Sequence, residues 1–131
     1  MGYTVSWRQY HFTDFTYATI LRILPTLINK DTPFRIHPWG FCLGTEDDPA
    51  PIERVPSMMT FIKTNRLPYT KDVMKALILM VEYGAADELA HDDDNMTWYI
   101  EALDEVHAIH PLASYEQQKA YFLHKAYLTK A

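Results

Sequence analysis

Hydrophobic and polar residues alternate at the start of the chain. Between residues 3 and 10, Tyr3, Val5, Trp7 and Gln9 fall on one side, and the residues between them fall on the other. Alternation with a period of two, carried by β-branched and aromatic residues, is typical of a β-strand. The pattern therefore predicts a first strand with one buried face.

The periodicity then changes to that of a helix. Thr13 and Asp14 offer side-chain oxygens that can cap a helix N-terminus. One apolar stripe at helical spacing is formed by Tyr17, Ile20, Leu21, Leu24, Leu27 and Ile28. Pro25 lies inside this stripe, and proline lacks the amide hydrogen that a helix interior needs. The first helix is therefore expected to kink or end near Leu24.

Two further strands are predicted in the first half of the chain. Residues 34–45 read as one strand, in which Pro38 and Gly40 indicate a bulge or an edge position. Residues 58–64 form the other. The segment 44–57 carries three prolines and an acidic run and is interpreted as a loop. Such a long loop is uncommon in a compact domain, so we expect it to be either functional or a mobile surface excursion.

From about residue 70 the chain is predicted to be helical. Residues 73–81 are apolar on nearly all sides, which is typical of a helix buried in the core. The acidic stretch 87–95 is interpreted as a surface connection. Two more helices follow, one that ends before Pro111 and one that begins near Ser114.

These elements succeed one another in the order β-α-β-β-α-α-α. Strands and helices grouped in this way favour the α+β class, here as a single domain over residues 1–131. We expect a small, mostly antiparallel sheet that is covered by helices on one face. The alternative is two loosely associated halves, but the helix at 73–81 needs the sheet to cover it.

Composition narrows the class of protein. The chain has 131 residues, of which 48% are hydrophobic and 14% aromatic, so it can form a core without disulfides or metal. The single cysteine, Cys42, and a start without a signal-peptide pattern favour a cytoplasmic, intracellular protein. Ser6 satisfies an N-myristoylation pattern, but bulky Tyr3 and the alternation favour a plain strand. The longest apolar run is too short for a bilayer, so we expect no membrane association.

The charge is distributed unevenly along the chain. The formal net charge is −5, which argues against a broad nucleic-acid surface. Residues 1–66 hold seven Lys and Arg against six Asp and Glu, whereas residues 67–131 hold five against eleven. The objection to an anionic partner is therefore weaker near Arg66 than elsewhere.

Basic residues surround the predicted start of the helix near residue 70. The residues assigned to a hypothetical anion site are Lys63, Arg66, Tyr69, Thr70 and Lys71. A helix N-terminus presents free amide donors and a partial positive charge, so a phosphate or carboxylate could bind there. Under the alternative interpretation the basic residues are only solvated and Thr70 only caps the helix. The segment contains no glycine, so it is not a phosphate-binding P-loop.

Histidine and cysteine provide weaker candidates for chemistry. His107 and His110 lie three positions apart on one predicted helix and could share a metal, but their spacing does not match the HExxH motif. A histidine in a last helical turn is also favourable through the helix dipole alone. Cys42 and His37 could act as nucleophile and base only if the intervening bulge brings them together. We therefore expect no metal and no cofactor.

The last predicted helix is rich in aromatic residues. Its candidate interface residues are Tyr115, Tyr121, Phe122 and Tyr127. A helix that is apolar on more than one side has more apolar surface than one core contact requires, which indicates packing on another subunit.

Two functional hypotheses follow from the sequence. Because no catalytic constellation is present, the first is a non-enzymatic interaction or assembly protein that forms a homo-oligomer through its C-terminal helices. The alternative is a small-molecule binding protein or enzyme with an anionic ligand at the helix that begins near Thr70.

Overall fold

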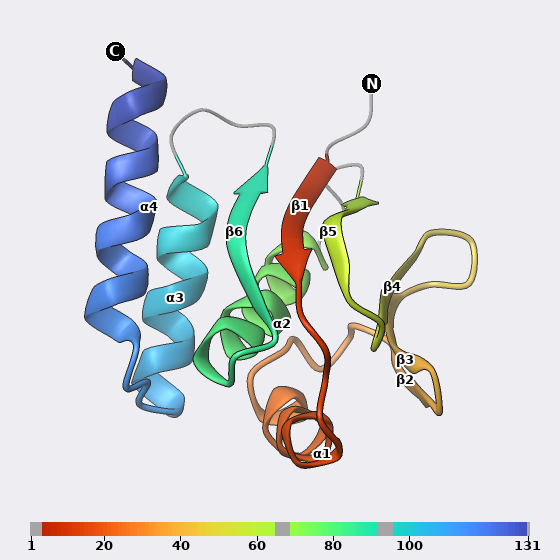
Figure 1. The fold of residues 1–131 in the computed structure, drawn as a ribbon. Helices are drawn as coiled ribbons and strands as arrows, with labels where there is room; N and C mark the ends of the chain where they lie inside the picture. Colours follow the sequence, from red (N-terminus) through yellow and green to blue (C-terminus); the bar gives the residue numbers. More distant parts are fainter. Residues whose placement is uncertain (1–3, 65–68, 92–95, 131) are drawn as a thin grey trace.

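The computed structural model describes residues 4–64, 69–91 and 96–130 (Figure 1). It confirms the α+β class, with four α-helices and two antiparallel three-stranded sheets in the described part of the chain. The prediction of one sheet is wrong, because the strands divide into two. No helix among the described residues is long and apolar enough to cross a membrane.

The first sheet is built around the strand predicted at the start of the chain. β1 (Thr4–Gln9) lies between β5 (Ser57–Lys63) and β6 (Ala86–His91), and both pairings are antiparallel. Val5, Trp7 and Gln9 are buried, as the alternation predicts, while the residues between them are half-buried.

β6 corrects the prediction that residues 87–95 are a surface connection. Residues 86–91 form this strand, and residues 92–95 lie outside the described part. β6 has a bulge, because Glu88 and Leu89 together oppose Trp7 of β1. This extra residue breaks the period of two, so the segment reads as a loop in sequence.

The second sheet has the order β2-β3-β4 and is formed by β2 (Phe34–His37), β3 (Gly40–Gly44) and β4 (Pro49–Glu53). The single strand predicted over 34–45 is therefore a hairpin. The predicted loop 44–57 contains a full strand, whose prolines, Pro49 and Pro51, alternate with the buried Ala50 and Ile52. Proline is tolerated on an edge strand, where its missing amide is not needed for pairing.

The helices largely follow the predicted pattern. They are α1 (Asp14–Ile23), α2 (Thr70–Glu82), α3 (Thr97–Ile109) and α4 (Tyr115–Lys130). Thr13 caps α1 by accepting a hydrogen bond from the Thr16 amide, and a short 3-10 turn, Leu24–Thr26, follows α1 at Pro25. Thr70 does not cap α2: it is the first helical residue, and Tyr69 occupies the cap position.

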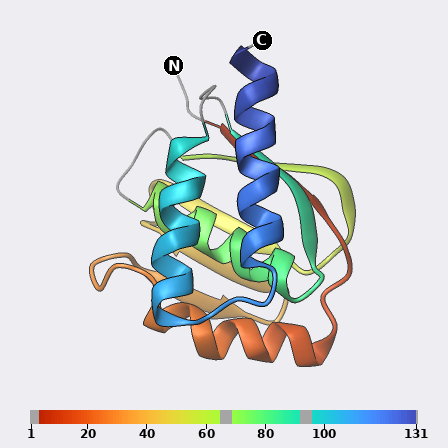
Figure 2. The same ribbon diagram turned by 90° about the vertical axis from the view of Figure 1, so that its left-hand side faces the viewer.

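α2 is the centre of the core. Residues 72–80 of this helix are all buried. α2 lies behind the β5-β1-β6 sheet and contacts α1, α3 and β6, and Figure 2 shows α3 and α4 running side by side. Apolar residues of both sheets, including Trp7 and Phe41, belong to the same buried cluster. A helix that is apolar on nearly all sides is thus covered by the first sheet and by other helices, within a core that both sheets share.

Candidate functional site

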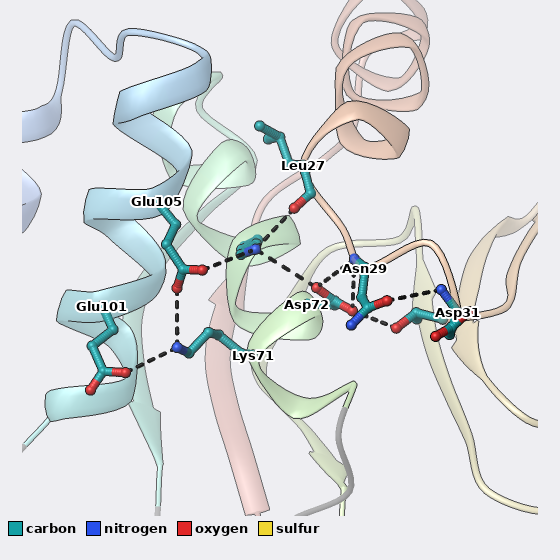
Figure 3. A network of polar contacts seen from close by, with 9 residues as sticks. Leu27, Asn29, Asp31, Lys71, Asp72, Glu101 and Glu105 are labelled. Atoms are coloured by element: carbon teal, nitrogen blue, oxygen red, sulfur yellow. Dashed lines mark hydrogen bonds and ion pairs between the residues drawn. The ribbon is translucent and has the colours of Figure 1, made fainter.

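Within the predicted anion site, Lys71 already has partners in the protein itself. Its ammonium group lies 2.9 Å from a Glu101 oxygen and 3.0 Å from a Glu105 oxygen, both on α3 (Figure 3). Burial alone would lower the pKa of Lys71, but the hydrogen bonds with Glu101 and Glu105 outweigh it and raise that pKa. Lys71 is therefore a paired cation that joins α2 to α3.

The other residues of that predicted site lie in different environments. Tyr69 is buried, and its hydroxyl donates a 2.5 Å hydrogen bond to the Asp48 carbonyl. Thr70 is buried, Lys63 is exposed on β5, and Arg66 lies outside the described residues. Tyr69 thus holds the start of α2 against the segment between β3 and β4, whereas the buried Thr70 hydroxyl has no hydrogen-bond partner among the described residues.

An acidic side chain of the protein itself occupies the first turn of α2. Asp72 is only 3% exposed and accepts hydrogen bonds from the Asn29 amide (3.2 and 3.3 Å) and the Thr32 hydroxyl (2.5 Å). The buried Lys75 ammonium group lies 3.9 Å from Asp72 and donates a 2.9 Å bond to the Leu27 carbonyl. Because a carboxylate is favourable at a helix N-terminus, Asp72 provides there the negative charge that a bound anion would otherwise supply.

The candidate metal ligands stabilise the end of α3. The Nδ1 atom of His107 accepts a 2.9 Å hydrogen bond from the Leu112 amide, and the ring stacks on Tyr115 at 4.0 Å. The Nε2 atom of His110 lies 3.1 Å from the Tyr83 hydroxyl. Within the described part of the chain, no group of three or more His, Cys, Asp or Glu side chains could hold a metal ion.

The Cys42 and His37 side chains, the hypothetical nucleophile and base, contact other residues. The Cys42 thiol is buried and receives a 3.4 Å contact from the Arg35 guanidinium, while the His37 ring stacks on Trp39 at 4.7 Å. Both side chains thus have structural partners inside the β2–β3 hairpin.

The four predicted interface residues do not form one surface. Phe122 is buried and stacks on Tyr99 at 5.0 Å, so its assignment to an interface is corrected to the core. Tyr115 is half-buried and donates a 2.6 Å hydrogen bond to Asp104. Tyr121 and Tyr127 are exposed. An apolar stripe on a helix does not distinguish a core contact from a subunit contact.

A pocket of about 410 Å³ lies between β6, the first turns of α4 and the end of α2. We call it the β6–α4 pocket. Its lining residues are Tyr10, Val81, Gly84, Ala86, Asp87, Glu88, Leu89, Ser114, Gln117, Gln118, Tyr121 and Phe122. Its volume falls in the range of small-molecule sites, and its aromatic and aliphatic walls are typical of them.

Two tyrosines are anchored at the β6 side of this pocket. The Tyr10 hydroxyl donates a 2.7 Å hydrogen bond to Asp87, and the Tyr121 hydroxyl donates a 3.1 Å bond to the Leu89 carbonyl. The bond to Asp87 raises the pKa of Tyr10, and burial, followed by the charges of Glu88 and Asp87, raises the pKa of Tyr121. Both phenols are therefore neutral at physiological pH.

The polar lining has unused acceptors and a strained backbone. The Oδ1 atom of Asp87 and the Oε1 atom of Gln118 are buried without a hydrogen-bond partner among the described residues, and Gln118 is only 4% exposed. Glu88 has a φ of 53°, in the left-handed region that disfavours side chains larger than glycine. The positive φ of Glu88 belongs to the β6 bulge, and the two unpaired oxygens are acceptors that a donor in the pocket could use.

Glu82 holds α4 in place beside the pocket. At the end of α2, its carboxylate accepts hydrogen bonds from the Ser114 amide (2.9 Å), the Ser114 hydroxyl (2.5 Å) and the Ala113 amide (3.1 Å). Burial raises the pKa of Glu82, but the bonds from Ser114 and Ala113 outweigh it, and the net shift is downward.

We expect Glu82→Gln to destabilise the protein by about 1 kcal/mol at neutral pH, because charged acceptors make stronger hydrogen bonds than neutral ones. A carboxyl group whose folded pKa is lowered adds stability above its unfolded pKa of about 4.3 and loses it as the pH falls through the folded value. The difference between wild type and variant should therefore shrink as the pH is lowered from 7 to about 3. Urea unfolding at each pH measures it. Glu116→Gln, at an exposed site on α4, is the control, and a difference independent of pH would contradict this role.

Sequence reasoning missed the residues of the β6–α4 pocket. The sequence assigns Tyr121 and Phe122 to a subunit interface and places Asp87 and Glu88 in an acidic surface connection, so neither pair is predicted to line a pocket. The sequence contains the adjacent carboxylates Asp87 and Glu88 and an aromatic last helix, but only the fold brings the two together. Comparison of the chain with protein-family models, with curated proteins and with solved structures returned no match, so the functional argument depends on the pocket itself.

Proposed function

We propose that the protein binds a small organic cation, a protonated amine with an apolar body, in the β6–α4 pocket. The observation that carries this proposal is the negative charge of the pocket lining. The charged side chains among the lining residues are Asp87 and Glu88, and both are negative. This is the opposite of the anionic ligand that the sequence suggested, and it concerns a different place in the fold.

The surroundings of the two carboxylates also favour a positively charged ligand. Val81 and Gly84, at the end of α2, line the pocket, and the C-terminal end of a helix carries a partial negative charge. Aromatic faces such as that of Tyr121 also attract cations. The described cations closest to these rings, Arg8 over Tyr10 at 5.3 Å and Lys125 over Tyr121 at 5.7 Å, are not among the lining residues.

The apolar part of the ligand is expected against the hydrocarbon walls. Val81, Leu89 and Phe122 supply aliphatic and aromatic surface, and burial of apolar surface contributes about 25 cal/mol per Å². The acceptors of Gln117 and Gln118 would then receive hydrogen bonds from the ammonium group or from a neighbouring donor. Because the Gln118 oxygen is covered in this structure, a small rotation of its side chain would accompany binding.

Three ligands of one shape test the sign of the charge. Phenethylamine is cationic, 2-phenylethanol is neutral and phenylacetate is anionic at neutral pH. We expect phenethylamine to bind with the highest affinity in calorimetric titration and to raise the melting temperature, because a ligand that binds only the folded state stabilises it.

Substitutions locate the binding. Asp87→Asn and Glu88→Gln are each expected to weaken phenethylamine binding about tenfold, or by about 1.4 kcal/mol. The amide introduced by Asp87→Asn would keep an oxygen for the Tyr10 hydroxyl, so the pocket wall should persist. Glu116→Gln, an exposed carboxylate on α4 outside the lining, is the matched control. Equal or tighter binding of phenylacetate, or no binding of any of the three, would refute the proposal.

A further inference from the structure

The edges of the two sheets are protected to different degrees. An exposed strand edge is a template for pairing with another chain, and proteins usually cover it or interrupt it. α3 and α4 flank the outer side of β6 (Figure 1). The Tyr99 and Tyr121 hydroxyls donate hydrogen bonds of 3.0 and 3.1 Å to the Ala90 and Leu89 carbonyls of this strand. The β6 edge is therefore covered.

Both edges of the second sheet are interrupted by proline. β4 contains Pro49 and Pro51, which have no amide hydrogen to offer a further strand. β2 is only four residues long and is bounded by Pro33 and Pro38. Short strands and prolines are both known means of preventing edge-to-edge association.

β5 is the least protected edge among the described residues, because β4 approaches it only across an open groove. It is the other edge strand of the first sheet, it contains no proline, and it is seven residues long. Three of its large apolar side chains are exposed, Met58 by 80%, Met59 by 74% and Phe61 by 61%. A bulge at Met58 and Met59 interrupts its pairing with β1, but residues 60–63 pair regularly.

We infer that β5 pairs antiparallel with β5 of a second copy of this chain. The strand is self-complementary when a twofold axis passes near Phe61. Phe61 then lies beside the partner copy's own Phe61, and Lys63 lies over the partner's Met59. Opposite residues of an antiparallel pair share one face, and aromatic and long apolar side chains stabilise each other there. The interface is isologous, as expected for a closed dimer.

Charge supports the antiparallel direction. An open groove between β4 and β5 is lined by Glu53, Ser57 and Lys63, among others. Glu53 and Ser57 are joined by a three-residue link, so they lie at one end of β5, and Lys63 lies at the other. Antiparallel pairing brings the Lys63 ammonium group of each copy toward the end that holds Glu53 in the other. The two Lys63 side chains are then at opposite ends of the interface, so they do not repel each other at short range.

The inference is tested by measuring the molar mass of the protein in solution, with the full chain. Sedimentation equilibrium over the micromolar range is expected to show a monomer–dimer equilibrium. Met59→Lys and Phe61→Lys should each weaken the dimer at least tenfold, because they place like charges next to each other across the twofold axis. Both side chains are exposed, so the circular dichroism spectrum of each variant should remain that of the wild type.

Leu123→Lys distinguishes β5 from the C-terminal helix as the interface. Leu123 is an exposed apolar residue of α4, and its replacement is expected to leave the dimer unchanged. Hydrogen exchange gives a second measurement: the outward-facing β5 amides of the wild type should gain protection as the protein concentration rises. A chain that stays monomeric throughout, or a dimer that Leu123→Lys dissociates and Phe61→Lys does not, would overturn the inference.

Discussion

Asp72→Ala is expected to lower the free energy of unfolding by about 2–4 kcal/mol, because buried donors lose a charged acceptor. The Asp72 carboxylate is buried, and it accepts hydrogen bonds from the Asn29 amide and the Thr32 hydroxyl. Its loss leaves both donors without their acceptor, while the buried Lys75 ammonium group loses one carboxylate at 3.9 Å and keeps Glu105 of α3 at 3.8 Å. Urea unfolding at neutral pH measures the change.

Two further variants separate this network from ordinary surface charge. Lys71→Ala removes only the half-buried contacts with Glu101 and Glu105 and should cost no more than about 1 kcal/mol. Asp72→Ala combined with Lys75→Met should be more stable than the sum of the single effects predicts, because an apolar pair leaves no uncompensated charge. A loss below about 1 kcal/mol for Asp72→Ala, or strict additivity, would show that the network is not coupled.

Gly40→Ala is expected to destabilise the protein by about 3 kcal/mol, since it adds a steric clash and backbone strain. Gly40 begins β3 with a φ of 153°, and a Cβ atom there would lie 2.1 Å from the Ile52 carbonyl oxygen and 2.9 Å from the Glu53 Cα atom. Both atoms belong to the backbone of β4, so neither can move without disturbing the β3–β4 pairing. The melting temperature and the unfolding midpoint in urea report the loss.

Gly84→Ala is the matched control for conformational strain. Gly84 also has a positive φ, 81°, but a Cβ atom there would meet nothing within 4 Å. Its replacement should cost only the strain of a non-glycine residue in the left-handed region, about 1 kcal/mol. If the two variants were equally stable, the close approach of β3 and β4 at Gly40 would not be a determinant of the fold.

Elements whose burial follows one local period could be predicted from the sequence. Val5, Trp7 and Gln9 alternate because one face of β1 is buried, and residues 73–80 are apolar except for Lys75 because α2 is surrounded. The cap at Thr13 and the end of α1 before Pro25 depend on neighbouring residues only. In each case the determining interaction spans a few residues, so the pattern alone reports it.

The strands that were missed lack such a local signal. β4 contains prolines that are typical of loops, and they are tolerated because the outer edge of β4 needs no amide donors. β6 contains a bulge at Glu88 and pairs with β1, some eighty residues earlier in the chain. The hairpin between β2 and β3 turns where a single strand with a bulge had been expected. Pairing over such separations is decided by the whole fold.

The sequence by itself determined the α+β class, the buried central helix, the first strand with its buried face and the uneven charge. Only the tertiary structure decided which charges are free and which are paired, because Lys71 meets Glu101, and Tyr10 meets Asp87, across 30 and 77 positions. Lys71 of the predicted basic site is therefore paired with carboxylates of α3, and the acidic pair beside α4 lines a pocket. Charge is a property of single residues, but an electrostatic site depends on which residues the fold brings within a few ångströms of one another.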